Sequence, residues 1–343
     1  MRRLLNTLYI TTEDAYLTKD GENVVVVKEA TELARFPLHT LESIVCFSYS
    51  GASPSLMGYC AQNGINMSFF TPRGRFLARA VGETNGNVLL RRRQYRIADS
   101  DEQSGHIARN MIFGKVYNCR WSIERTVRDH ALRVNVERLK DASTKLQASL
   151  RLIAKEESLD HLRGLEGEAA AVYFRVFNEM ILNNKDAFTF AGRSRRPPLD
   201  NVNALLSFVY TLLTNDCAAA LEGVGLDSYV GFLHRDRPGR ASLALDLVEE
   251  LRAVMADRFV LTAINMQIVK PDDFIVRENG GVQITDECRK RILSAWQAKK
   301  KETIMHPYLK EKIQWGLVPH VQALLLARHL RDDLEEYPPF LWK

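Results

Sequence analysis

Four polar side chains in three distant segments have the chemistry needed to bind a divalent cation. Asp246 and Glu249 lie three residues apart on a helix predicted to begin at Ser242, so both carboxylates project from one face. The neighbouring positions are apolar, and carboxylates among apolar residues are either paired or bound to a cation. Glu166 lies in a segment rich in Gly and Ala. His234 ends an apolar run just before an Arg-rich loop.

Carboxylates combined with one imidazole are ligands that suit Mg²⁺ or Mn²⁺ better than a structural zinc site. Such an ion can polarise a phosphodiester oxygen while nearby arginines hold the flanking phosphates, which points to phosphoryl transfer on nucleic acid. The alternative is that His234 is an ordinary core histidine and the acidic residues pair with Arg237, Arg240 or Arg252. Spacing alone does not bring Glu166 near His234.

The distribution of charge favours nucleic acid modestly. The net charge is only +5, but residues 1–87 hold 8 basic and 8 acidic side chains, so the whole excess lies after position 87. Arginine mixed with tyrosine suits phosphate contact and base stacking, whereas the alternative is a set of solvated helix faces. The basic clusters lie at residues 91–96, 193–196, 235–240 and 299–301.

The chain divides into two patterned regions, and the fold class predicted is α+β. A small β-rich domain, residues 1–86, carries one helix at residues 53–62, and turn-forming residues 84–87 mark a hinge. A larger all-α catalytic domain, residues 87–343, follows with one inserted β-hairpin at 274–285. Strands are predicted at 8–11, 23–28, 43–48, 66–70 and 75–81, and helices at 105–157, 165–183, 201–221, 242–265, 286–301 and 315–333.

Cysteine usage and hydropathy bear on where the protein acts. Five cysteines without a Cys-x-x-Cys pair are typical of a reducing compartment. The longest apolar stretch, near residues 204–213, is shorter than the roughly 20 residues of a membrane span, and no signal peptide pattern is seen. We therefore expect a cytoplasmic, unprocessed protein with no membrane partner.

Several segments, in matching order, closely resemble the Cas1 family, the CRISPR-associated integrases that insert new spacers. The resemblance covers nearly the whole chain, and the ends are similar to the branch found with type I-C systems. The segments are Gly-Asn-Val-Leu-Leu-Arg-Arg-Arg-Gln-Tyr-Arg at 86–96, the Glu-Gly block at 162–174, Asp-Asn-Val-Asn-Ala-Leu-Leu-Ser at 200–207, Gly-Phe-Leu-His at 231–234, Asp-Leu-Val-Glu-Glu-Leu-Arg at 246–252, and the ends 6–10 and 338–342.

The resemblance implies a set of site residues. Glu166, His234 and Glu249 would ligate Mg²⁺ or Mn²⁺, with Asp246 as a further acidic contact in the catalytic group. Glu166 is preferred to Glu168 because the family ligand directly precedes the glycine. The resemblance implies weaker assignments as well: DNA contacts by Arg91, Arg92, Arg93, Arg163, Arg237 and Arg240, and packing or hydrogen bonding near the site by Tyr173 and Tyr210.

The resemblance also implies partners and a reaction. Members dimerise, largely through the β domain, and assemble with Cas2 into a heterohexamer. The 3′-hydroxyl of a prespacer attacks a phosphodiester at the CRISPR repeat boundary in double-stranded DNA. Two other functions stay open, namely a structure-specific metal-dependent DNA nuclease and a non-catalytic DNA-binding scaffold.

Overall fold

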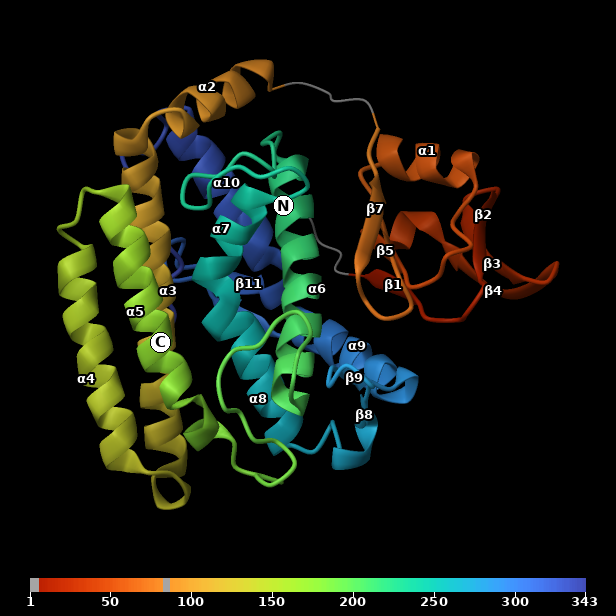
Figure 1. Ribbon diagram of the computed structural model, residues 1–343. Helices are drawn as coiled ribbons and strands as arrows, with labels where there is room; N and C mark the ends of the chain where they lie inside the picture. Colours follow the sequence, from red (N-terminus) through yellow and green to blue (C-terminus); the bar gives the residue numbers. More distant parts are fainter. Residues whose placement is uncertain (1–5, 83–86) are drawn as a thin grey trace. The chain divides into compact units, whose positions relative to one another are not determined.

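The computed structural model describes residues 6–82 and 87–343, so most of the predicted hinge and domain boundary lies outside the described residues. The chain forms two compact units (Figure 1). The first contains the described residues of Met1–Asn85 together with Asp286–Thr303 and Gln314–Leu317. The second contains the remaining described residues, and each unit is considered separately below.

The first unit is built on two sheets around one apolar core. Strands β1, β5 and β6 are parallel and β7 closes that sheet antiparallel, while β2, β3 and β4 form an antiparallel sheet. Helix α1 begins as predicted, because the Ser53 hydroxyl accepts a hydrogen bond from the Leu56 N–H. The elements are β1 (Thr7–Ile10), β2 (Tyr16–Asp20), β3 (Asn23–Lys28), β4 (Thr31–Pro37), β5 (Ser43–Cys46), α1 (Pro54–Gln62), β6 (Asn66–Phe70), β7 (Phe76–Ala80) and α9 (Asp286–Lys301).

The five predicted strands are present, but β2 and β4 were not predicted. Both flank β3, whose residues Val24, Val25 and Val26 are buried. Strand β4 is exposed or half-buried along its length and carries charged side chains, which conceal the alternation expected of a strand. The first unit also takes in α9, which differs from the predicted domain of residues 87–343. The Lys300 ammonium of α9 donates to the Thr7 hydroxyl of β1.

The second unit is helical, as predicted, and α3, α4 and α5 pack side by side (Figure 1). The π-helical segment Arg252–Asp257 joins α7 to α8, so the helix predicted at 242–265 is one run with a local change of pitch. The elements are α2 (Val88–Ala98), α3 (Asp101–His130), α4 (Val136–Ile153), α5 (Leu159–Arg175), α6 (Asn201–Gly223), α7 (Ser242–Leu251), α8 (Arg258–Asn265), α10 (Val318–Leu330) and the predicted hairpin β8 (Phe274–Val276) and β9 (Val282–Ile284).

Two predictions for this region were wrong. The helix predicted at 105–157 is broken, because the Asn135 side chain caps α4 by accepting a hydrogen bond from the Arg138 N–H at 3.0 Å. A second two-stranded pair, β10 (Thr303–Met305) and β11 (Lys312–Gln314), accompanies the predicted hairpin. The short strands carry too few residues to show a period.

The apolar stretch expected near residues 204–213 lies in helix α6, which is longer than that estimate. By length and composition it could cross a membrane, because its 23 residues have a window of mean hydropathy 1.4. Its window is nevertheless 67% buried inside the fold, and it packs against α7 and α10. These are the surroundings of a core helix.

Candidate active site

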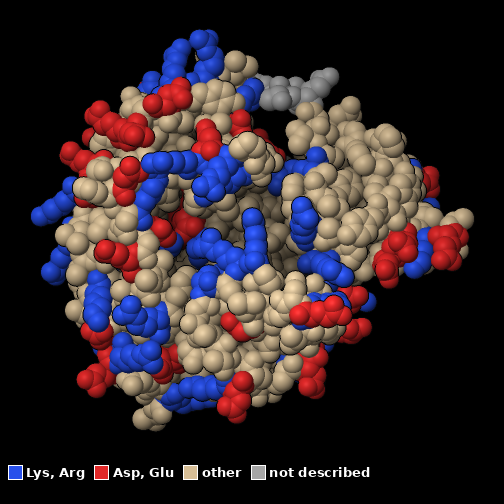
Figure 2. All heavy atoms as spheres, in the orientation of Figure 1, with Lys and Arg blue, Asp and Glu red and all other residues tan. Residues whose placement is uncertain are grey.

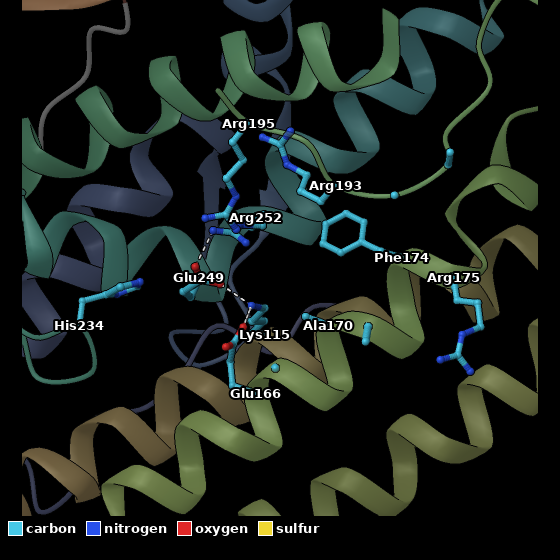
Figure 3. A pocket seen from close by; sticks show the side chains of 14 residues that line it. Lys115, Glu166, Ala170, Phe174, Arg175, Arg193, Arg195, His234, Glu249 and Arg252 are labelled. Atoms are coloured by element: carbon cyan, nitrogen blue, oxygen red, sulfur yellow. Dashed lines mark hydrogen bonds and ion pairs between the residues drawn. The ribbon is translucent and has the colours of Figure 1, made fainter. Parts of the chain in front are cut away.

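A cavity of about 620 Å³ opens in the helical unit where α3, α5 and α7 meet the segment before α6 (Figure 3). It brings together Glu166, His234 and Glu249, which the sequence separates by up to 83 positions. Three of the four predicted catalytic residues therefore share one hollow. Its lining consists of Lys115, Glu166, Gly167, Ala170, Ala171, Phe174, Arg175, Ala191, Gly192, Arg193, Arg195, His234, Glu249 and Arg252.

Helix α5 supplies Glu166 and much of the open space. The helix begins at Leu159, where the Ser158 hydroxyl accepts a hydrogen bond from the His161 N–H. Gly167 has no side chain, and Ala170 and Ala171 have only a methyl group, so this part of α5 projects little into the cavity beside Glu166. A Cβ on Gly167 would meet nothing within 4 Å. This confirms that the small residues keep the space clear.

Helix α7 supplies Glu249, whose carboxylate is buried between two cations. One oxygen accepts a hydrogen bond from Arg252, and the other forms an ion pair with Lys115 at 2.5 Å. Burial alone would raise the pKa of Glu249, but the charges of Arg252 and Lys115 lower it to about 2. Glu249 is therefore ionised at neutral pH and carries a full negative charge at the cavity wall.

Asp246 lies behind His234 and holds it. This carboxylate is fully buried and accepts hydrogen bonds from the backbone N–H groups of Phe232, Leu233 and His234, at 2.7 to 3.0 Å. Its Oδ1 is also 2.6 Å from His234 Nδ1. A carboxylate at Nδ1 favours the tautomer with a proton there, which leaves Nε2 as the ligating nitrogen. The structure thus gives Asp246 a positioning role and leaves it outside the cavity lining.

Lys115 lies between the two glutamates and was not predicted from the sequence. Its ammonium contacts Glu166 on one side and Glu249 on the other, and its side chain is 3% exposed. A signal was available: Ile112, Lys115 and Cys119 fall on one stripe of α3, where the other two residues are buried. A lysine on an apolar stripe needs a buried anionic partner.

Arginines cover the opposite wall, two of them held by one tyrosine. The guanidinium groups of Arg193 and Arg252 lie over the Tyr210 ring, 5.1 and 4.9 Å from its centroid. The Tyr210 hydroxyl donates to the buried Asp257 carboxylate at 2.5 Å. Tyr210 therefore packs behind the cavity as a support for its arginines. Tyr173 is also buried there, where burial and then the charge of Asp257 raise its pKa.

The two carboxylates and the imidazole of the cavity suit a hard divalent cation, although their ligating atoms do not converge on one point. Within residues 6–82 and 87–343, no group of three His, Cys, Asp or Glu side chains is arranged to hold an ion. The two carboxylates instead share the Lys115 ammonium, so the site already attracts positive charge. In the described part of the chain Glu249 Oε2 accepts no hydrogen bond and has only this ion pair. Figure 3 shows the His234 imidazole extended toward Glu249.

The family model described as CRISPR associated protein Cas1 matches residues 8–298. The chain belongs to the Cas1 family. It is 48% identical over 343 residues to CRISPR-associated endonuclease Cas1 1 of Chlorobaculum tepidum, and 51% identical over 347 residues to CRISPR-associated endonuclease Cas1 2 of Rhodospirillum rubrum. Each alignment covers 100% of both chains.

Solved structures show the same Cas1 fold at low identity. A casposase bound to its integration product has a TM-score of 0.82 at 22% identity, covering 98% of this chain and 94% of that one. A chain of a Cas6-RT-Cas1–Cas2 complex has a TM-score of 0.80 at 22% identity and covers 98% of this chain and 36% of that one. The predicted fold class is confirmed. The type I-C branch stays a prediction.

None of the six arginines predicted to contact DNA lines the cavity of this Cas1 protein. Arg163 donates to the Leu233 carbonyl at 2.9 Å, next to His234, and so packs beside the site. Arg91 donates to the Gly225 carbonyl, and Arg93 pairs with Asp332. Arg92 and Arg237 are exposed, and Arg240 is half-buried. Figure 2 shows Lys and Arg side chains (blue) spread over this face of the helical unit, with Asp and Glu side chains (red) among them.

Proposed function

We propose that this protein is a divalent-metal-dependent DNA integrase and endonuclease of CRISPR adaptation. It joins the 3′-hydroxyl ends of a prespacer to the boundary of the CRISPR repeat. One observation carries the proposal: Glu166 and Glu249 converge on a buried cation at the wall of a cavity that also contains His234 and four arginines. Paired carboxylates opposite guanidinium groups match a phosphodiester and the metal that activates it.

Glu166, Glu249 and His234 would hold the metal, Mg²⁺ or Mn²⁺. When bound, the ion would polarise a phosphodiester oxygen and stabilise the charge that develops during in-line displacement. Carboxylate oxygens with one imidazole match the ligand preferences of both ions. Asp246 prepares the imidazole by fixing its orientation and its tautomer.

The other side chains of the cavity bind and orient the DNA backbone. Arg193 and Arg252 lie over the Tyr210 ring. Arg193 also donates to Asn203 and Ser207, and Arg252 to Glu249, so a phosphate would be bound through their remaining N–H groups. Arg195 lines the same wall. The small residues of α5 leave room for a nucleotide strand opposite these arginines.

The proposal includes partners and a location. We propose that double-stranded DNA is bound as prespacer and as repeat, and that the chain acts as a homodimer with Cas2 in a heterohexamer in the cytoplasm. Support comes from the Cas1 family membership and from the shared fold of the chain in the Cas6-RT-Cas1–Cas2 complex.

A strand-transfer assay tests the reaction. Purified protein, with and without Cas2, is given a supercoiled array plasmid, Mn²⁺ and a labelled prespacer that ends in a 3′-hydroxyl. We expect a covalent half-site product that is absent with a 3′-deoxy prespacer, whereas nicking without joining would indicate a hydrolytic nuclease. Glu166→Gln and His234→Ala should abolish the product while DNA affinity is largely kept, because phosphate contacts dominate affinity. Full activity in both variants would contradict the site.

A further inference from the structure

Lys115 places a positive charge where the proposed metal site needs a free pair of carboxylates. It projects from α3 between Glu166 of α5 and Glu249 of α7 and contacts both carboxylates (Figure 3). Its side chain is 3% exposed, whereas Glu166 is 26% exposed. The ammonium therefore bridges two elements of the site from beneath the surface.

The charges at this point balance without a metal. Lys115 and Arg252 supply two positive charges, and Glu166 and Glu249 supply two negative ones. A divalent cation added to the unchanged group would leave two uncompensated positive charges in a buried place, which is unfavourable. Withdrawal of one of the two resident cations lowers this excess from two charges to one and therefore favours metal binding.

Lys115 is the resident cation able to move. Arg252 is fixed by its contact with the Tyr210 ring at 4.9 Å and by its hydrogen bond to Glu249. Lysine carries a compact charge on a flexible stem of four carbons. Lys115 also lines the cavity, which gives the displaced ammonium open space to enter.

We propose that Lys115 is an internal counter-ion that competes with the divalent metal for Glu166 and Glu249. In the metal-free protein it holds the two carboxylates together, and on metal binding it is displaced into the cavity. Lys115 is thus a positioning residue that sets both the stability of the empty site and its affinity for metal. This inference rests on the proposed function, because it takes the two glutamates as metal ligands.

The first test measures Mn²⁺ binding and thermal stability in Lys115→Met, a variant of similar length without the charge, and in Lys115→Arg as the control that keeps the charge. Mn²⁺ binding is followed by electron paramagnetic resonance of the free ion. We expect Lys115→Met to bind Mn²⁺ about tenfold more tightly, because a cation at contact distance is removed. Lys115→Arg should bind no more tightly than the unchanged protein.

Thermal unfolding gives a second readout. Without metal, Lys115→Met should have a lower Tm, because two carboxylates then face each other with one counter-ion fewer. Mn²⁺ should raise its Tm by more than it raises that of the unchanged protein, as tighter binding to the native state requires. Equal affinities and equal Tm increments in the two proteins would overturn the proposal.

A chemical footprint tests displacement in the unchanged protein and so does not depend on a variant that folds. Lysines are acetylated with an N-hydroxysuccinimide ester with and without Mn²⁺, and each site is quantified by mass spectrometry. Lys115 should become several-fold more reactive with Mn²⁺, while Lys145, whose side chain is 55% exposed and paired with Asp141, should not change. A Lys115 that stays protected while Mn²⁺ is bound would overturn the proposal.

Glu166→Gln separates this inference from the proposed function. If Glu166→Gln weakens Mn²⁺ binding but Lys115→Met leaves it unchanged, the metal site stands and the competing role of Lys115 fails. If Glu166→Gln binds Mn²⁺ as well as the unchanged protein, the assigned metal ligands are wrong, and both proposals fail.

Discussion

Glu249 and Glu250 are adjacent on α7, yet one faces the cavity and the other is fully buried against the C-terminal tail, residues 337–343. Glu250 accepts hydrogen bonds from the Tyr337 hydroxyl at 2.8 Å, from Gln322 at 2.7 Å and from the Phe340 N–H at 3.0 Å. The tail is therefore anchored on the residue next to the proposed metal ligand Glu249.

Removing one of these hydrogen bonds should destabilise the protein. In Tyr337→Phe the Glu250 carboxyl loses a donor and Gln322 loses an acceptor in a buried place. We expect the free energy of unfolding to fall by about 1–3 kcal/mol. The measurement is urea unfolding, and Tyr308→Phe is the matched control because Tyr308 is 47% exposed. Equal stability of the two variants would contradict the role of the tail.

A side chain at position 231 should disturb His234. A Cβ added to Gly231 would lie 2.7 Å from Asp246 Oδ2 and 2.9 Å from Ser242, so the carboxylate that positions His234 must move. Gly231→Ala should cost about 1–3 kcal/mol and weaken Mn²⁺ binding. Gly164→Ala is the control, because a Cβ there meets nothing within 4 Å and alanine favours the helix. A Gly231→Ala variant as stable as this control would contradict the argument.

The sequence predicted the core of the fold because its signals are local. The valines of β3 and the Ser-Pro start of α1 mark an element within a few residues. The break before α4 was missed, since a single capping asparagine inside a long apolar period is a weak signal. The grouping of α9 with the β-rich unit depends on contacts across almost 300 positions, as between Thr7 and Lys300.

The acidic residues of the candidate site could be predicted from the sequence, but its basic residues could not. Glu166, His234 and Glu249 were candidates from their residue types, the family resemblance grouped them as ligands, and the structure brings them to one cavity. Lys115 was missed because its role depends on two carboxylates from other helices. The arginines singled out for DNA lie elsewhere, since a cluster of charges in sequence does not tell which members face a cavity.

The buried Asp257 should make stability depend on pH. Burial raises its pKa to about 6 from an ordinary value of 3.8, although the Tyr210 hydroxyl partly opposes this. The unfolded chain therefore loses this proton at lower pH than the native protein. The contribution of Asp257 is fully favourable below pH 4 and is lost as the pH rises to 6, by about 3 kcal/mol in total.

Asp257→Asn tests this dependence, because asparagine does not titrate and still offers an oxygen to Tyr210. Urea unfolding of both proteins at pH 4.5 and pH 7.5 isolates the contribution. We expect the unchanged protein to lose stability relative to Asp257→Asn as the pH rises. A difference between the two proteins that stays constant over this range would show that Asp257 is ionised in the native state throughout.

Arg92 should contribute to DNA binding without sequence preference. It is exposed on α2, whereas its neighbours are engaged: Arg91 donates to the Gly225 carbonyl and Arg93 pairs with Asp332 at 2.9 Å. An unengaged arginine can neutralise a phosphate and release a counter-ion. Arg92→Ala should therefore weaken binding equally for different duplexes and flatten the slope of log K against log salt by about 1.

Fluorescence anisotropy with labelled duplexes at several salt concentrations measures this slope. Arg128→Ala is the control, because Arg128 is exposed but already pairs with the adjacent Asp129 at 2.8 Å. Removing a compensated charge should leave the slope nearly unchanged. If Arg92→Ala keeps the full slope as well, the face of α2 that carries Arg92 does not contact the DNA backbone.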